Sequence, residues 1–429
     1  MEWLVLGLFC AGLVLCLALD ASILYALLAG LLLFFLYGRR KGFSWSALLK
    51  MALDGVKTVK NILITFLLIG VLTALWRSAG TIPVIVCWAA RLIRPSVYLL
   101  MTFLLNAGVS VLTGTSFGTA ATMGVISATM GGVMGVPVVL TGGAVLSGVF
   151  FGDRCSPVST SALLVAELTK TSIFDNIKRM VRTALVPFLA SCAVYLLLGL
   201  FSPHGEGALD LTALFSREFD LSLWAVIPAV VILALSLLRV NVKLAMGASI
   251  LSAVPLCLLL QGRSPVELLK TALVGFTAAD AQVAAMLNGG GVTSMLRVGA
   301  IVCLSSSYSV IFRKTGLLDQ VKGAIGRLAT RTSRFFAMLL TSILAGMVAC
   351  NQSLTILLVH QLCGELHENN SDLALDLEDT AVVVAPLVPW SIAGAVPLSA
   401  VGAPGVSVLL ACYLYLLPAW RLCCTRLRK

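Results

Sequence analysis

Residues 97–136 read VYLLMTFLLNAGVSVLTGTSFGTAATMGVISATMGGVMGV, and this stretch decides the fold class of the chain. It joins two apolar runs, Val97–Leu112 and Ala120–Val136, through a short segment rich in glycine and hydroxyl residues. A membrane-crossing helix needs roughly 20 apolar residues. Strands of a membrane barrel would alternate in polarity, which these runs do not. The stretch therefore predicts helices in a membrane, joined by a break at membrane depth.

The whole chain has the same character. It has 429 residues, of which 59% are hydrophobic and 11% are charged. Soluble domains carry about a quarter charged residues, so this composition excludes a soluble enzyme, a nucleic-acid binder and a disordered protein. Similar apolar runs repeat almost from end to end. We expect an all-α polytopic membrane protein with roughly 11 to 13 apolar helical segments, several of them broken or re-entrant.

The net charge of +11 comes from basic residues in short loops between apolar runs. Basic clusters follow residue 38, occupy residues 313–334 and close the chain at residues 421–429. Such clusters mark cytoplasmic loops, so we expect both termini in the cytoplasm and the protein in the cytoplasmic membrane. Two polar, acid-rich stretches, Ser202–Asp220 and Gly364–Asp379, are expected outside. Because Met1-Glu2-Trp3 lacks a basic segment, we expect the first apolar run to be retained.

The interruptions recur at an offset of about 237 residues, as inverted repeats of a transporter would require. These repeats predict a division into an N-terminal helical pair with a cytoplasmic loop (1–60), a first repeat (61–201), connecting helices (202–290), a second repeat (291–420) and a basic tail (421–429). Three pairs of segments come into line: Trp76–Gly80 with Phe312–Gly316, Thr113–Ser116 with Cys350–Ser353, and Gly148–Asp153 with Pro386–Ser391. Paired breaks are the best sequence indication of a transporter's binding site.

The first break offers neutral ligands from Thr113, Thr115, Ser116 and Thr119. A half-helix beginning here would direct its positive end at an anion, whereas carbonyl groups freed by unwinding could hold a cation. Small-residue helix packing is the alternative explanation. The second break offers Asn351, Gln352 and Ser353 in the same way.

Carboxylates near membrane depth are the second kind of candidate, because they are costly there and usually functional. Asp153 ends an apolar run and is followed by Ser156 and Ser159; its alternative role is an ion pair with Arg154. Glu378 and Asp379 precede a second run, where acids also complement a helix dipole. Asp280 is a weaker candidate that a solvated turn would explain.

Residues 114–118 also match the G-x-S-x-G pattern of serine hydrolases, which requires a strand-to-helix turn and a base. An intramembrane hydrolase using Ser116 and His360 is therefore a remote alternative. The chain contains no G-x-x-x-x-G-K-[ST] loop, which argues against ATP-driven pumping by this chain alone. We therefore expect a transporter and not an enzyme.

Taken together, these segments resemble the NhaC-type sodium/proton antiporter family of the ion-transporter superfamily. The resemblance covers roughly residues 60 to 405 and runs through Gly80–Pro83, Thr113–Ala120, Gly152–Ser159, Lys314–Leu318 and Leu377–Trp390. It implies a secondary transporter with two inverted repeats, and it carries the family's motif acids over to Asp153, Glu378 and Asp379. Relatives are similar to exchangers of malate and lactate or to amino-acid transporters.

Two departures from the family pattern concern the cargo. Thr160 stands where the family usually has Asp, and Asn351 stands where it often has Asp. We expect a sodium/proton antiporter that works by alternating access, with Na⁺ at Asp153 as the only metal, no cofactor beyond transported Na⁺ and H⁺, and contact with membrane lipid. Cation-coupled transport of a small carboxylate or amino acid is the alternative, and a homo-oligomer stays open.

Overall fold

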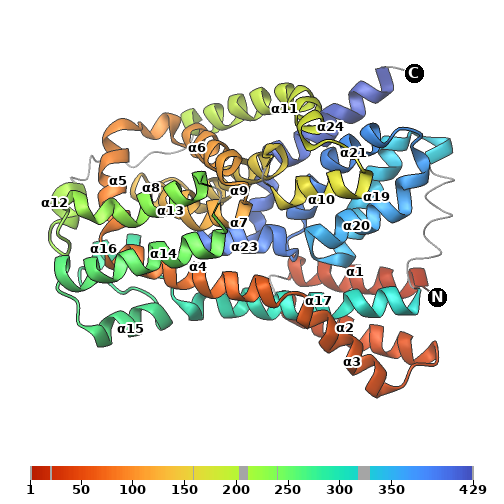
Figure 1. Ribbon diagram of the computed structural model, residues 1–429, viewed down its shortest axis with the longest axis horizontal. Coiled ribbons are helices and arrows are strands. Elements are labelled where there is room, and N and C mark those ends of the chain that lie inside the picture. The colour runs from red at the N-terminus through yellow and green to blue at the C-terminus, as the bar shows by residue number, and fades with distance from the viewer. Residues whose placement is uncertain are drawn as a thin grey trace.

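The computed structural model describes residues 2–19, 22–157, 159–201, 211–238, 240–316 and 329–427. These residues form helices, with one isolated β-bridge between Phe276 and Gly289. Among them, six helices are long and apolar enough to cross a membrane, or up to eight spans if each of two bent pairs counts as one. The predicted all-α polytopic membrane protein is therefore confirmed. Figure 1 shows both ends of the chain at the same end of the molecule.

The long helices and bent pairs set the frame of the fold. The two bent pairs turn by 47° and 55° at their breaks. The long elements are α2 (Ile23–Arg40), α6 (Tyr98–Thr113), α9 (Val138–Cys155), α11 (Ile173–Phe201), α14 (Val242–Pro255) with η4 (Leu256–Leu260), and α17 (Leu296–Thr315). The bent pairs are α3 (Trp45–Thr58) with α4 (Lys60–Ser78), and α21 (Asn370–Asp379), α22 (Ala381–Val384) and η7 (Ala385–Leu387) with α23 (Ile392–Ala400).

Shorter helices connect these elements. Near the breaks they are α7 (Ser116–Thr119), η2 (Ala120–Gly124), α8 (Val125–Val133), α10 (Thr160–Thr169), α19 (Arg334–Ala349), α20 (Gln352–Cys363) and η6 (Gly364–Leu366). The others are α1 (Glu2–Ala18), α5 (Thr81–Leu92), η1 (Pro95–Val97), α12 (Leu211–Phe215), η3 (Leu223–Val226), α13 (Ile227–Leu237), α15 (Pro265–Val274), α16 (Ala281–Leu287), η5 (Val292–Met295), η8 (Gly405–Leu410) and α24 (Cys412–Leu427).

The first predicted break is the tip of a helical hairpin. α6 ends at Thr113, Gly114 adopts the left-handed conformation (φ 66°), and Thr115 caps α7 by accepting a hydrogen bond from the Gly118 N–H. The chain then returns through η2, a π-helical turn of the kind often found at functional sites, and α8. The Tyr98 hydroxyl at the start of α6 donates to the Ser127 carbonyl 2.6 Å away. The two arms therefore lie side by side.

The second break forms a hairpin of the same design. α19 ends at Ala349, Cys350 is left-handed (φ 55°), and Asn351 caps α20 by accepting from the Ser353 and Leu354 N–H groups. Arg334 at the start of α19 forms an ion pair of 3.5 Å with Glu368, just after α20. This hairpin also returns to the end from which it started. Figure 1 shows α8 and α19, which lie at the bases of the two hairpins, at opposite ends of the molecule.

The bounds of the two hairpins repeat in the sequence. α6 begins at 98 and ends at 113, and α19 begins at 334 and ends at 349, a shift of 236 residues at both ends. The same shift relates left-handed Gly80 to left-handed Gly316. It also carries the cap Thr115 (φ −145°, ψ 120°) onto Asn351 (φ −146°, ψ 131°). This recurrence supports the predicted internal repeat. The shift of 236 residues differs by one residue from the offset of about 237 that the sequence predicts.

One topological expectation is wrong. The sequence predicts the acid-rich stretch Gly364–Asp379 on the side opposite the basic C-terminal residues, but Arg421 forms an ion pair of 2.7 Å with Asp376. Arg334, from the basic segment before α19, contacts Glu368 in the same stretch. These acids partner the basic residues of their own end of the molecule, so their presence does not mark the outer face.

Two glycines bring α9 close to α6. A Cβ atom on Gly148 would lie 2.6 Å from the Phe103 carbonyl oxygen, and one on Gly152 would lie 2.2 Å from the Ser110 Cβ. Their i, i+4 spacing is the small-residue pattern that lets membrane helices approach closely. Gly152 precedes Asp153, so this packing fixes the end of α9 beside the first break.

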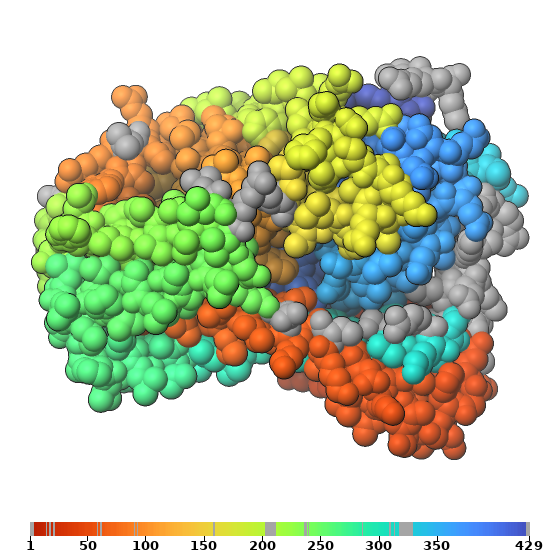
Figure 2. Space-filling model, viewed as in Figure 1, coloured from red at the N-terminus to blue at the C-terminus, as the bar shows by residue number. Residues whose placement is uncertain are grey.

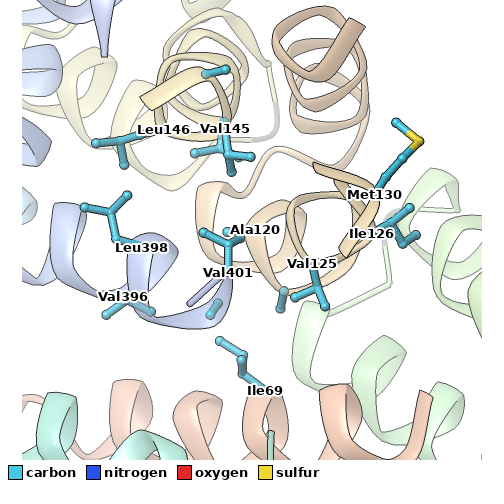
Figure 3. Packing of buried hydrophobic residues seen from close by; sticks show 14 of the residues in the cluster. Ile69, Ala120, Val125, Ile126, Met130, Val145, Leu146, Val396, Leu398 and Val401 are labelled. Atoms are coloured by element: carbon cyan, nitrogen blue, oxygen red, sulfur yellow. The ribbon is translucent and has the colours of Figure 1, made fainter. Parts of the chain in front are cut away.

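A hydrophobic cluster fills the space behind the breaks. Figure 3 shows apolar side chains converging from both halves of the chain: Ile69 of α4, Ala120 of η2, Val125, Ile126 and Met130 of α8, Val145 and Leu146 of α9, Val396 and Leu398 of α23, and the adjacent Val401. A second cluster joins the N-terminal helices to α17 through the rings of Phe9, Phe34 and Tyr308. Figure 2 shows the N-terminal segment projecting from the rest of the surface.

Candidate functional site

Asp153 lies in the last turn of α9, where the helix gives way to an extended segment before α10. The residue is 3% exposed. Ser156 holds this segment against the first hairpin, because its hydroxyl donates to the Val111 carbonyl 2.7 Å away. The close α6–α9 packing and this bond place the Asp153 segment next to the end of α6.

Three neutral groups donate to the Asp153 carboxylate. Ser159 lies 3.0 Å from Oδ1, and Ser161 lies 2.9 Å from Oδ2. Gln352 Nε2, from the second hairpin, lies 3.3 Å from Oδ2 and also donates to the Val382 carbonyl at 3.1 Å. The first-repeat carboxylate and the second break are therefore joined directly.

Arg154 does not neutralise Asp153. Its guanidinium forms a fully buried ion pair with Asp379, 225 residues away in the sequence. It also donates to Thr183 at 2.9 Å and to the Met180 carbonyl at 3.2 Å. The proposed Asp153–Arg154 pair is therefore not formed, because adjacent residues of a helix point in different directions.

Asp379 belongs to a row of paired acids on α21. Asp372, Asp376 and Asp379 lie at i, i+4 and i+7, so they share one face of the helix. Their side chains are 55%, 12% and 0% exposed in that order. The partners along the row are Arg179 at 2.9 Å, Arg421 at 2.7 Å from both Asp376 and Asp379, and Arg154. His367 also contacts Asp376 at 3.0 Å. Asp379 is thus held between two arginines.

Glu378 has a different environment from its neighbour. The residue is fully buried, and neither carboxyl oxygen has a hydrogen-bond partner among the described residues. Its charge would interact with those of Arg154, Asp153 and Asp379. A carboxyl group in such surroundings is far less costly to bury neutral than charged, so Glu378 is suited to holding a proton.

The remaining predicted ligands do not reach Asp153. The hydroxyls of Thr113 and Thr119 lie 3.0 Å apart, and Thr119 donates to the Thr115 carbonyl at 2.8 Å. Asn351 is used as a helix cap, and Ser353 is exposed. The hydroxyls of the first break thus stabilise the tip of the hairpin in this conformation.

Two alternatives receive no support from the geometry. Ser116 is buried, but the described residues give it no hydrogen bond to His360 or to another base. Asp280 caps α16 and forms an ion pair of 3.4 Å with Arg217. The backbone N–H groups of Gln282 and Val283 hold the pKa of Asp280 below its usual range. Asp280 therefore behaves as an ordinary capping residue at a turn.

Sequence reasoning missed two residues of the site region. Ser161 contacts Asp153 directly, and Arg421 bridges two acids of α21. Ser159 is the N-cap of α10, and Ser161 lies two residues after it. Both hydroxyls donate to the Asp153 carboxylate, so the Ser159-Thr160-Ser161 sequence could have indicated Ser161 once Ser159 was a candidate. Thr160, between them, is exposed. No local pattern marks Arg421.

Comparisons with known proteins give a separate line of evidence, from sequence similarity. The model of the Na⁺/H⁺ antiporter family matches residues 2–166 and 148–420. A malate-2H⁺/Na⁺-lactate antiporter of Bacillus subtilis is 26% identical, with 87% of this chain and 82% of the relative covered. The Na⁺/H⁺ antiporter NhaC of the same organism is 28% identical, with 88% and 86% covered. The arginine/ornithine antiporter ArcD of Halobacterium salinarum is 27% identical, with 86% and 79% covered.

Proposed function

The chain belongs to the Na⁺/H⁺ antiporter family, and on that premise we propose that it exchanges sodium ions for protons at Asp153. The observation that carries the proposal is a buried carboxylate without a cationic partner. Asp153 receives only neutral donors, while Arg154 is committed to Asp379. A carboxylate at membrane depth needs a positive counter-charge, and either a proton or a hard cation that prefers oxygen ligands can supply it.

Exchange follows if the two cations exclude each other. A proton on Asp153 removes the negative charge that attracts sodium, and bound sodium occupies the oxygens that would take the proton. Only the occupied, neutral site then moves between the two faces. This is the requirement for coupled antiport by alternating access.

The two hairpins supply a means of alternating access. The Asp153 segment contacts the first hairpin through the hydrogen bond from Ser156 to the Val111 carbonyl. It contacts the second hairpin through the hydrogen bond from Gln352 to Asp153. Irregular backbone at membrane depth is tolerated where it is buried in protein or lines a cavity. We infer that the hairpins are inverted counterparts and that rocking of one half against the other exposes Asp153 to each face in turn. Glu378 provides a second group that can hold a proton nearby.

The test uses purified protein in liposomes with an acid interior and an internal pH dye. Sodium alone is expected to dissipate the pH gradient, and lithium and potassium measure its selectivity. A response only after addition of an organic acid or amino acid would contradict sodium/proton exchange and support the second candidate function.

Ser161→Ala tests the ligand shell of Asp153. A hydrogen bond to a charged group contributes about 1.5–3 kcal/mol, so we expect the half-saturating sodium concentration to change by roughly tenfold or more. Ser353→Ala is the matched control, because Ser353 is exposed and lies at the same break as Gln352. Equal effects of the two substitutions would remove Ser161 from the site.

The second candidate is cation-coupled transport of a small organic solute. It is favoured by the neutral residues Thr160 and Asn351, which stand where the family usually or often has Asp, and by relatives whose names specify malate, lactate, arginine or ornithine. The liposome experiment separates the two candidates directly.

We also propose a location in the cytoplasmic membrane with both termini in the cytoplasm. The basic residues at the end that carries the termini support this orientation through the positive-inside rule. Lipid contact follows from the exposed apolar side chains of the long helices, and self-association remains a proposal that size measurements can test.

A further inference from the structure

Arg77 is a partly buried cation to which the described residues give no ion pair. It lies in the last full turn of α4, and its Nε atom is buried without a hydrogen-bond partner. Its only hydrogen bond among the described residues runs from Nη1 to the Thr73 carbonyl at 3.5 Å, the limit for such a bond. Most of the hydrogen-bonding capacity of the guanidinium group is therefore unused.

Other arginines with buried side chains are paired in this structure. Arg154 contacts Asp379, Arg421 contacts Asp376, and Arg263 contacts Glu218 at 3.6 Å. Removing an arginine from water without a partner is costly, and the cost falls only when an anion or several acceptors approach it. Arg77 thus lacks, within the described chain, the partner that its environment calls for.

A glycine loop lies against Arg77. Gly289, Gly290 and Gly291 all have positive φ values, of 130°, 77° and 79°. The Gly291 N–H donates to the Gly70 carbonyl at 2.8 Å, which holds the loop on α4, and the Gly289 N–H donates to the Phe276 carbonyl at 3.0 Å. A Cβ atom on Gly289 would lie 3.9 Å from Arg77 Nη1. Because the N–H groups of Gly289 and Gly291 are engaged in these bonds, the loop leaves the Gly290 N–H, of these three, for a ligand.

The end of α4 also adjoins a polar segment. Gln261 Nε2 donates to the Ala79 carbonyl at 3.2 Å and to the Asp220 carbonyl at 3.0 Å. Arg77 therefore lies two residues from a contact with the segment that leads from α12 to η3, in which Asp220 is exposed.

We propose that Arg77 and the Gly289–Gly291 loop form an oxyanion-binding site that takes the carboxylate of a small organic acid. A guanidinium group binds a carboxylate or phosphate through two parallel hydrogen bonds, for which Arg77 has free donors. Exchange of sodium for protons at Asp153 requires no anion site. The inference is therefore independent of sodium/proton exchange, and it names a ligand class that the second candidate function would also use.

Thermal unfolding in a phosphate-free detergent tests the site on the full chain. The probes are lactate, malate, inorganic phosphate and chloride, each added as the same cation salt. We expect the carboxylates to raise the melting temperature of the wild-type protein by about 2 °C or more, because ligands that bind only the folded state stabilise it. Arg77→Gln should abolish the shift, and Arg77→Lys should retain part of it.

The control is Arg217→Gln, which removes an exposed cation from the same end of the molecule and should leave the shift unchanged. Without added anions, Arg77→Gln should melt no lower than wild type, since it removes an unpaired charge. Stabilisation of the wild type by phospholipid but by none of the soluble anions would overturn the assignment to a solute and identify a lipid phosphate. Equal shifts in wild type and Arg77→Gln, or no shift with any probe, would overturn the site itself.

Discussion

Asp153→Asn is expected to reduce sodium-driven proton movement to the rate of protein-free liposomes. The substitution keeps the shape of the side chain and one oxygen acceptor, so one of the Ser159 and Ser161 hydroxyls must turn to accept from the new amide, and it removes the negative charge. Without that charge, neither a proton nor sodium has a counter-charge at the site. The fold should persist, because no positive group depends on Asp153 for neutralisation.

The measurement compares equal amounts of correctly inserted protein in the pH-gradient assay. Asp372→Asn is the matched control, since it neutralises an aspartate that is 55% exposed and pairs with Arg179. The control should exchange sodium at nearly the wild-type rate. Normal exchange by folded Asp153→Asn would remove Asp153 from the coupling mechanism.

Arg154→Met should produce the largest loss of stability. Arg154 joins α9 to three other helices: it pairs with Asp379 of α21, donates to the Met180 carbonyl and Thr183 of α11, and contacts the Tyr413 hydroxyl of α24 at 3.4 Å. Removing one partner of a buried ion pair costs about 3–5 kcal/mol, and Asp379 would keep Arg421 alone as its counter-charge. We expect a large fall in melting temperature or a failure to accumulate folded protein.

Arg179→Met provides the comparison, because its ion pair with Asp372 is exposed and should contribute about 1 kcal/mol or less. The double variant Arg154→Met/Asp379→Asn should recover part of the loss, since it also removes the buried charge that Arg154 no longer pairs, while Arg421 keeps Asp376 as a partner. An Arg154→Met protein as stable as Arg179→Met would mean that the Arg154–Asp379 pair does not hold the two halves together.

The sequence sufficed for the features that local chemistry determines. Glycine and hydroxyl residues predicted the break at Gly114, and the position in the repeat predicted the break at Cys350, although a non-glycine residue there has a positive φ. The cost of a carboxylate at membrane depth singled out Asp153. Each of these predictions depends on a few adjacent residues or on a simple repeat.

The remaining features depend on packing between distant segments. No local pattern connects Arg154 with Asp379, and the row of acids on α21 resembles an ordinary solvated helix face until Arg179, Arg421 and Arg154 are placed beside it. For the same reason, charge alone did not show that Gly364–Asp379 lies at the same end of the molecule as the basic residues Arg334 and Arg421. The hydroxyls of Thr113 and Thr119 could not be distinguished from ligands before their mutual hydrogen bond was known.

The central claim is that sodium and a proton compete for one carboxylate, and the pH dependence of sodium affinity tests it most directly. The half-saturating sodium concentration should be measured in wild-type liposomes at a series of pH values. Over the pH range in which the site takes up its proton, the half-saturating sodium concentration should rise about tenfold for each pH unit of acidification, because sodium must displace one proton. A half-saturating concentration that stays constant while the maximal rate changes with pH would contradict competition at Asp153.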